Sequence, residues 1–239
     1  MKVISIKTLI VVSHPEINNS QTEEFLQQAA KAMEDVTWHH VESLEKIDVD
    51  AEHKLLKQAD RIIFQFPLYW YSAPAGLKHW IDTVMGRNFV YGDEQYNLED
   101  KEFGLVVTTG MPLKDFQVGG SEGMSLDQIM TPYRAFAKRA KMIIMPIFTV
   151  AQFWYQTEPQ QMKLLIDYQR YINQKYPDSL NNRQDWFEHE LTKFVSRLSD
   201  EDERNANLVL ETFREQIEDL DQLNDTLKMI KKGEDDNLE

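Results

Sequence analysis

The sequence predicts an α/β protein built on a doubly wound, mostly parallel sheet of about five strands. Short apolar runs of strand length alternate with segments whose apolar residues recur at helical spacing. The clearest unit spans residues 59–85: a β-branched strand at Arg61–Phe66, an aromatic loop, and a helix carrying Leu77, Trp80 and Val84. Because connections between such units are short and right-handed, successive strands are expected to lie parallel.

The other elements follow in chain order. The further expected strands are Lys7–Val12, Val36–Val41, Phe103–Thr108 and Met142–Val150. The further expected helices are Gln21–Met33, a short helix capped by Asp50, Ser125–Ala140 and Thr157–Tyr176. Pro132 predicts a kink or a restart inside the third of these helices, and Pro146 favours a sheet edge for the last strand.

The chain changes character after Pro177-Asp178. From Asp185 onward it has no proline and a single glycine, Gly233, so residues 181–239 are expected to form an acidic helical extension to a domain at residues 1–180. One apolar stripe there alternates three and four spacing: Leu210, Phe213, Ile217, Leu220 and Leu227, with Asn224 in the missing place. Two interpretations stay open, packing on its own domain and a coiled-coil contact with a second chain. The tail Lys231–Glu239 is expected to be disordered.

Composition excludes several classes of function. The formal net charge of −14 argues against binding nucleic acid or anionic lipid, but not against a small anionic cofactor held by backbone amides. With no cysteine, the chain cannot form disulfides, thiolate metal sites or a cysteine nucleophile. Lys7 interrupts the N-terminal apolar run, and no later run reaches membrane-spanning length. We expect a soluble, cytoplasmic protein without membrane insertion.

Two loops at the carboxyl ends of strands are the candidate ligand-binding segments. In a sheet of order 2-1-3-4-5, the strands before His14–Thr22 and Pro67–Ser72 flank the switch point where a mononucleotide binds. Ser20, Gln21 and Thr22 at a helix start suit a phosphate, although a plain N-cap is the alternative. The three aromatics at 69–71 suit a planar ring, with core packing as their alternative. Neither a dinucleotide fingerprint nor a P-loop sequence is present.

These segments also resemble a known family. The stretch QFPLYWYSAPAGLKHWID, with SHPEINNSQT before it and VVTTG after it, is similar to the flavodoxin-like NAD(P)H:quinone oxidoreductases. That family includes the modulator-of-drug-activity enzymes and the ancillary oxidoreductases of glutathione-gated potassium efflux systems. The resemblance covers Thr8–Tyr176, and Phe89–Lys101 is similar to a characteristic loop of the family. It implies a flavodoxin-like sheet and an FMN-binding domain.

The resemblance implies a set of flavin-binding residues. They are His14, Ser20, Gln21, Thr22 and Glu23 around the phosphate and ribityl chain, Leu68, Tyr69, Trp70 and Tyr71 along the ring, and Thr108, Thr109, Gly110 and Met111 at its other edge. Met111 stands where the family usually has a second glycine. FMN is favoured over FAD because the shorter bacterial members use FMN and no adenine-binding fingerprint occurs. Phe116 and Glu122 occupy positions where animal quinone reductases have tyrosine and histidine, so Phe116 is expected to line the substrate site and no catalytic residue is assigned.

The activity implied is a two-electron, ping-pong transfer from NAD(P)H through FMN to a quinone-like acceptor. Relatives are commonly homodimers, so a homodimer is expected. Three alternatives remain: a regulatory subunit docking on a potassium-efflux transporter through residues 181–239, an azo- or nitro-compound reductase, and a one-electron carrier. No metal is expected, because the adjacent His39 and His40 would point to opposite faces of a strand.

Overall fold

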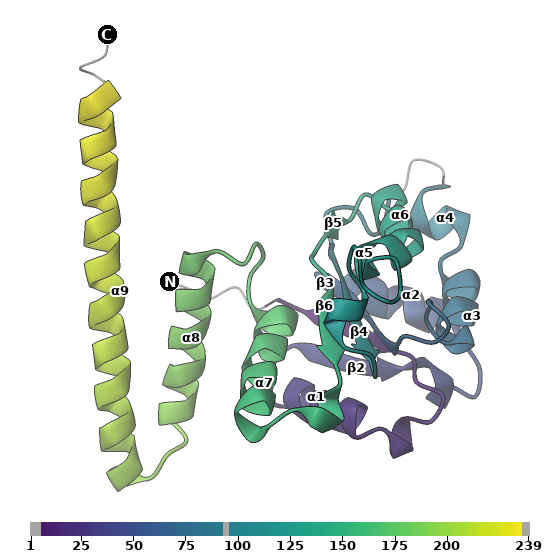
Figure 1. Ribbon diagram of the computed structural model, residues 1–239, viewed down its shortest axis with the longest axis horizontal. Helices are drawn as coiled ribbons and strands as arrows, with labels where there is room; N and C mark the ends of the chain where they lie inside the picture. Colours follow the sequence, from purple (N-terminus) through teal and green to yellow (C-terminus); the bar gives the residue numbers. More distant parts are fainter. Residues whose placement is uncertain (1–5, 93–95, 236–239) are drawn as a thin grey trace. The chain divides into compact units, whose positions relative to one another are not determined.

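The computed structural model describes residues 6–92 and 96–235, which Figure 1 shows as ribbon. Contacts divide the chain into two compact units, the first ending at Gln174 and the second beginning at Lys175. The predicted functional division, an FMN-binding domain at 1–180 and a helical extension at 181–239, stays a prediction. Within the described residues, no helix combines the length and apolar character needed to cross a bilayer.

The first unit contains a parallel sheet in the predicted order. Its strands are β1 (Thr8–Val12), β2 (Val36–His40), β3 (Arg61–Pro67), β4 (Glu102–Thr109), β5 (Ile143–Ile144) and β6 (Phe148–Ala151). They lie in the order β2-β1-β3-β4-β5, and β6 also pairs with β4. The flavodoxin-like fold predicted from the sequence is thereby confirmed, with a sixth strand added.

The sixth strand corrects the prediction of a single last strand at Met142–Val150. Pro146 divides that segment, since it has no amide hydrogen to donate to a sheet ladder. The piece before it, β5, pairs with the start of β4 at Glu102 and Phe103, whereas β6 pairs with its end at Val106–Thr109. The division matters for function, because it brings the chain after β6 to the carboxyl edge of the sheet.

The helices of this unit cover both faces of the sheet. They are α1 (Gln21–Lys31), α2 (Val49–Gln58), α3 (Ala75–Val84), α4 (Arg87–Val90), α5 (Leu126–Ile129), α6 (Thr131–Arg139) and α7 (Glu158–Asn173). The cap of α2 is Asp48 rather than Asp50, because the Asp48 carboxylate accepts from two backbone amides at 3.1 Å. Pro132 restarts the helix, so the predicted Ser125–Ala140 is α5 followed by α6. Residues 93–95 of the loop similar to the family's lie outside the described residues.

Two hydrophobic cores flank the sheet because successive strand residues point to opposite faces. Leu9 and Val11 of β1 lie in the core that α2, α3, α5 and α6 cover, and Ile10 and Val12 in the core covered by α1 and α7 (Figure 1). Each fully buried aliphatic side chain of this size contributes about 1.5–3 kcal/mol to folding. The two cores hold the strand ends, and therefore the loops that follow them, at fixed positions.

Arg61, at the start of β3, holds together the amino-terminal edge of the sheet. Its fully buried guanidinium pairs with Glu102 at 2.6 Å and donates to the carbonyls of Tyr171 and Gln174 at 2.5 and 2.6 Å. Those carbonyls lie at the end of α7, where backbone acceptors have no partner within the helix. One side chain thus joins β3, β4 and α7.

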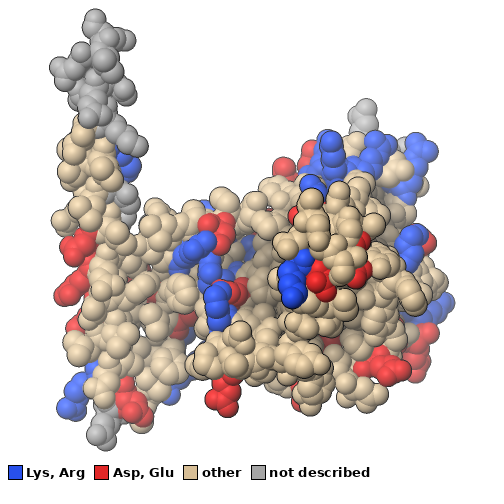
Figure 2. Space-filling model, in the orientation of Figure 1, with Lys and Arg blue, Asp and Glu red and all other residues tan. Residues whose placement is uncertain are grey.

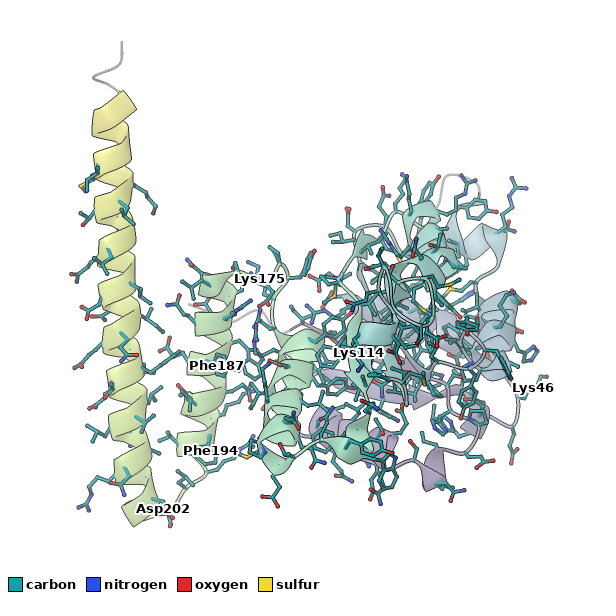
Figure 3. All side chains as sticks on the ribbon, viewed as in Figure 1. Lys46, Lys114, Lys175, Phe187, Phe194 and Asp202 are labelled. Carbon is teal, nitrogen blue, oxygen red and sulfur yellow. The ribbon has the colours of Figure 1, made fainter. Side chains whose placement is uncertain are left out.

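The second unit is a helical hairpin of α8 (Leu180–Val195) and α9 (Asp200–Asp235). The two helices pack against each other, and Arg214 of α9 pairs with Glu188 of α8 at 2.6 Å. Figure 3 places Phe194 and Asp202 at the same end of the hairpin, so the helices are antiparallel. Since α9 is helical through Asp235, the predicted disordered tail is wrong for residues 231–235, and residues 236–239 lie outside the described residues.

Candidate active site at the carboxyl edge of the sheet

The loop after β1 ends in a helix start that suits an anion. Ser20 caps α1 with its hydroxyl oxygen 3.2 Å from the amide of Glu23. Ser20 is therefore an N-cap, as the alternative interpretation predicts. The cap satisfies the amide of Glu23 only, and the amides of Gln21 and Thr22 have no intrahelical acceptor at this position. Those amides and the helix dipole make the start of α1 a candidate phosphate site.

His14 lies in the same loop and is nearly buried. Its Nδ1 accepts from the backbone amide of Glu16 at 3.2 Å, so the neutral ring carries its proton on Nε2. Burial lowers the pKa of His14 below its usual value, although nearby Glu42 acts in the opposite direction. At neutral pH the ring is therefore an uncharged donor, suited to a phosphate or hydroxyl oxygen.

Glu42 holds this loop from the side of β2. Its carboxylate accepts from the Ser13 hydroxyl at 2.5 Å and from the His14 amide at 3.2 Å, and it lies 3.3 Å from His40. His39 points the other way and pairs with Glu52 at 2.9 Å, which confirms the predicted opposite faces of the two histidines. Among the described residues, no group of three histidine, aspartate or glutamate side chains could hold a metal ion.

Glu23 lies beneath the loop and not on its surface. It is 1 % exposed; one carboxylate oxygen accepts from the Gln65 amide at 2.6 Å, and the other has no partner. The Tyr168 hydroxyl donates to the side-chain oxygen of Gln65 at 2.7 Å, so the series of hydrogen bonds extends to α7. Burial raises the pKa of Glu23 to about 7, while the bond from Gln65 opposes that rise. This series of hydrogen bonds joins the start of α1 to the end of β3, between the two predicted loops.

The loop after β3 is a tight turn of aromatic residues. Tyr69 and Ser72 exchange two backbone hydrogen bonds, of 2.9 and 3.0 Å, across Trp70 and Tyr71. Both central residues have positive φ, +48° and +62°, a conformation usually taken by glycine or asparagine. Trp70 is 94 % exposed, and Tyr69 and Tyr71 are also exposed, so core packing does not explain this triplet. The two backbone hydrogen bonds thus hold a strained turn that presents three aromatic rings at the surface.

Tyr71 is tied to the long glycine-containing loop on its other side. Its hydroxyl donates to the Glu122 carboxylate at 2.8 Å, and this hydrogen bond raises the pKa of Tyr71. Glu122, which the resemblance to animal quinone reductases aligns with a histidine, thus contacts the aromatic turn through Tyr71.

The segment after β4 forms the opposite edge of the site. The Thr109 carbonyl accepts from the Gln152 amide at 2.8 Å, and the Thr109 hydroxyl accepts from the Met111 amide at 3.1 Å. A Cβ atom added to Gly110 would meet nothing within 4 Å, so the backbone there faces open space. On the other side, the Leu68 amide donates to the Thr108 carbonyl at 2.8 Å and fixes the spacing of the two loops.

A third wall follows β6 and was missed by the sequence analysis. Gln152 has a φ of +48°, and after it come Phe153, Trp154 and Tyr155, of which the last two are 65 % and 81 % exposed. The signal was available, because FWY after the last strand repeats the pattern of YWY after β3. The expectation of a single edge strand at Met142–Val150 gave the aromatic residues after it no place at the site.

Together these segments enclose a cleft of about 180 Å³. Its lining includes the predicted residues Thr22, Leu68, Tyr69, Thr108, Thr109 and Gly110, together with Pro67, Val150, Gln152, Phe153, Trp154 and Tyr155. The other predicted residues do not line it: His14, Ser20, Gln21, Glu23, Trp70, Tyr71 and Met111. Phe116 lies buried in the core on the α3 and α6 side, and its substrate-lining role stays a prediction.

The composition of the cleft fits a flat cofactor with a phosphate at one end. Gly110 leaves room at one side, aromatic rings lie at the other, and Thr22 connects the cleft to the start of α1. The cleft lies at the carboxyl ends of β3, β4 and β6, and Thr22 joins it to the loop after β1, the neighbour of β3 at the switch point where doubly wound folds bind mononucleotides. The sequence model described as flavodoxin-like fold matches residues 6–173.

The chain belongs to the flavodoxin-like family. Among relatives, it is 35 % identical over 146 residues to an NAD(P)H oxidoreductase of Bacillus subtilis named YrkL, covering 60 % of this chain and 84 % of that one. It is 34 % identical over 139 residues to the glutathione-regulated potassium-efflux ancillary protein KefG of Yersinia enterocolitica, covering 57 % and 76 %. The family resemblance read from the sequence motifs is confirmed.

Solved structures extend the comparison. An NADPH-quinone reductase from P. pentosaceus is 46 % identical, with a TM-score of 0.67 over 70 % of this chain and 98 % of that one. General stress protein 14 of Treponema denticola, solved in complex with FMN, is 31 % identical, with a TM-score of 0.63 over 70 % and 97 %. Each of these two is aligned over almost its whole length, so about 30 % of this flavodoxin-like chain has no counterpart in either.

Proposed function

We propose that this flavodoxin-like protein is an FMN-dependent NAD(P)H:quinone oxidoreductase that transfers two electrons in a ping-pong reaction. The observation that carries the proposal is the cleft at the carboxyl edge of the sheet, where Thr22, Tyr69 and Gly110 line one opening. The names of the relatives support it, since they include NAD(P)H oxidoreductase and NADPH-quinone reductase, and one neighbour holds FMN. A cytoplasmic homodimer is part of the proposal.

Different residues would bind the phosphate and the ring of FMN. The amides of Gln21 and Thr22 and the Nε2 proton of His14 would hold the phosphate, and backbone groups at Thr109 and Gly110 would meet the ring edge. Tyr69 would lie along the ring face, and Trp154 and Tyr155 would exclude water from the acceptor side. Bound FMN supplies the hydride chemistry, so no side chain has to act as acid or base.

The test begins with the cofactor. We expect the protein as purified to show a flavin absorbance spectrum, and mass spectrometry of the released cofactor to identify FMN rather than FAD. The loaded protein should then oxidise NADH or NADPH when menadione is present. Loaded protein that turns over no quinone would contradict the proposed activity. Azo and nitro compounds in the same assay decide whether they are better acceptors.

A second candidate is a regulatory subunit of a potassium-efflux transporter. The likeness to KefG favours it, and residues 175–239, which lie beyond the family match, would offer a docking surface. If so, the full chain should bind the transporter in detergent, and the chain ended after Gln174 should not, while both retain flavin and turnover. Binding by neither chain would leave the soluble reductase as the function.

A further inference from the structure

Glu23 is a buried acidic residue beside the groups that would bind the cofactor phosphate. It is the third residue of α1, next to Thr22, and only 1 % exposed. An acid at this position of a helix commonly bonds the amide of the capping residue. Here the Ser20 amide donates to the Ile17 carbonyl at 3.1 Å instead, and the exposed Glu24 already complements the helix dipole. Capping and dipole therefore do not explain why Glu23 lies inside the protein.

The carboxyl group of Glu23 has one hydrogen bond and no counter-ion. One oxygen accepts from the side-chain amide of Gln65 at 2.6 Å, and the other is buried without a partner. In the part of the chain that the structure describes, no cationic side chain acts on it. Burying an unpaired carboxylate costs much more than burying the neutral acid, so burial raises the pKa of Glu23 to about 7.

The titratable groups on the elements around Glu23 leave its charge unopposed. From α7, Tyr168 reaches Glu23 through Gln65, and burial together with Glu23 holds the pKa of Tyr168 well above its ordinary value. The loop after β1 and strand β2 supply titratable groups that interact with one another and, among the described residues, not with Glu23: His14, Glu16, His40 and Glu42. The strands β4 and β6 add apolar side chains to this core.

The surface near α1 offers no basic patch that could offset an additional negative charge. On the face that Figure 2 shows, basic side chains gather over α4 and α6. The lower part of the first unit, where α1 lies, shows acidic side chains and hardly any basic ones on this face. The phosphate would therefore depend on uncharged donors, the backbone amides and the His14 ring. A carboxylate within the first turn of α1 would oppose it.

We propose that Glu23 is a positioning residue for the cofactor phosphate, which binds more tightly at the start of α1 while the Glu23 carboxyl group is neutral. The role assigned to Glu23 rests on the proposed function, in which FMN occupies the cleft. The neutral acid keeps the two loops joined through Gln65, whereas the carboxylate adds a charge that repels the phosphate. A glutamine could accept the same hydrogen bond, so what the acid adds is a proton that leaves near neutrality. Affinity for FMN is then full below pH 7 and falls above it.

The dissociation constant of FMN between pH 7 and 9 tests this role. In that window the phosphate carries two charges, and the lowered pKa of His14 keeps its ring neutral. If bound phosphate raises the pKa of Glu23 by one further unit, the constant should rise roughly fivefold across the window. Fluorescence titration of the full-length protein, stripped of flavin, measures it. Riboflavin, which has the same ring and no phosphate, should show no such dependence.

Two variants and one calorimetric measurement isolate the proton. Glu23→Gln should bind FMN with a constant that does not change between pH 7 and 9 and stays within about twofold of the wild-type value at pH 7. Glu24→Gln removes an exposed charge from the same turn and should keep the wild-type dependence. Calorimetry of the wild type in two buffers needs no variant: binding of FMN at pH 8 should take up roughly 0.4 proton.

Several results would overturn the role of Glu23 and leave the proposed function standing. They are a wild-type constant for FMN that is independent of pH, the same pH dependence in Glu23→Gln, and an equal dependence for riboflavin. Binding of FMN without proton uptake at pH 8 has the same meaning. Absence of FMN binding at every pH would instead contradict the proposed function, and the role of Glu23 with it.

Discussion

Single residues in the first unit show how the two halves of the site are joined. Glu23 belongs to the start of α1 and Gln65 to the end of β3, and their 2.6 Å hydrogen bond lies beneath both loops. The cost of this arrangement is a buried carboxyl group with one oxygen unpaired. Its pKa of about 7 makes that cost depend on pH near neutrality.

Glu23→Gln should remove this pH dependence. The folded protein holds the Glu23 proton up to about pH 7, whereas the unfolded chain loses it near the ordinary value of 4.5. Wild-type stability should therefore fall as pH rises from 4.5 to 7, by about 3 kcal/mol in total. We expect the unfolding free energy of Glu23→Gln, relative to wild type, to rise by that amount across the window. Urea unfolding at a series of pH values measures it.

The control for this prediction lies next to it in the chain. Glu24 is in the same turn of α1 but is exposed, so Glu24→Gln should follow the wild-type pH profile. If the unfolding free energies of Glu23→Gln and wild type changed in parallel between pH 4.5 and 7, the pKa of Glu23 would not be raised in the folded protein, which would contradict the prediction.

His14→Ala should separate phosphate binding from ring binding. If the Nε2 proton of His14 donates to the phosphate, its loss should weaken FMN about tenfold or more, since a hydrogen bond to a charged group contributes about 1.5–3 kcal/mol. Riboflavin, which has the same ring and no phosphate, should bind wild type and variant equally. Fluorescence titration with each flavin measures both constants, and equal losses for the two would count against the phosphate role.

Among the elements, the turn after β3 has a conformation that conflicts with its residues. Trp70 and Tyr71 both have positive φ, although bulky side chains disfavour that region by about 1–2 kcal/mol per residue. The two bonds between Tyr69 and Ser72 and the contact of Tyr71 with Glu122 hold the turn in place. Because strained turns cluster at functional sites, we expect the exposed rings beside the cleft to serve binding and not stability.

Trp70→Gly and Trp70→Ala test this interpretation as a pair. Because Trp70 is 94 % exposed, neither change removes buried surface, and only glycine relieves the left-handed conformation. We expect the glycine variant to be about 1 kcal/mol more stable than the alanine variant in urea unfolding. Both variants should show the same rise in KM for menadione, since both lose the ring. A glycine variant no more stable than alanine would place the strain elsewhere.

The whole molecule is a family unit with an added hairpin. The match to the family ends at residue 173, and the first compact unit ends at Gln174. The two hydrophobic cores and the cleft lie within that unit, and the related NADPH-quinone reductase is aligned over 98 % of its own length without any extension.

A chain ended after Gln174 should therefore fold and keep its flavin site. We expect its FMN affinity and menadione turnover to stay within about twofold of the full-length values, because no residue of the cleft is removed. The Arg61 bond to the Gln174 carbonyl survives at this cut, whereas ending the chain at Ile172 would remove it and lower stability. A soluble but flavin-free product would show that the hairpin supports the site.

The sequence by itself determined the alternation of strands and helices, both loops of the switch point and the family, and the family in turn implied the strand order. These follow from local patterns: period-two and period-3.6 hydrophobicity, the strand-ending Pro67, and the run QFPLYWYSAP. Such patterns depend on neighbouring residues, so they can be read without knowing what lies across the fold.

Only the tertiary structure decided which side chains face the cleft. Glu23 was grouped with the phosphate loop, yet the helix turn points its carboxylate at Gln65, and Phe116 packs into a core. The aromatics after β6 join the site because Pro146 shifts β6 to the end of β4, a pairing between residues some 40 apart in the chain. On α9, packing against α8 decides that Leu210 is buried while its neighbour Val209 is exposed. Each of these depends on contacts between distant segments, which local periodicity does not encode.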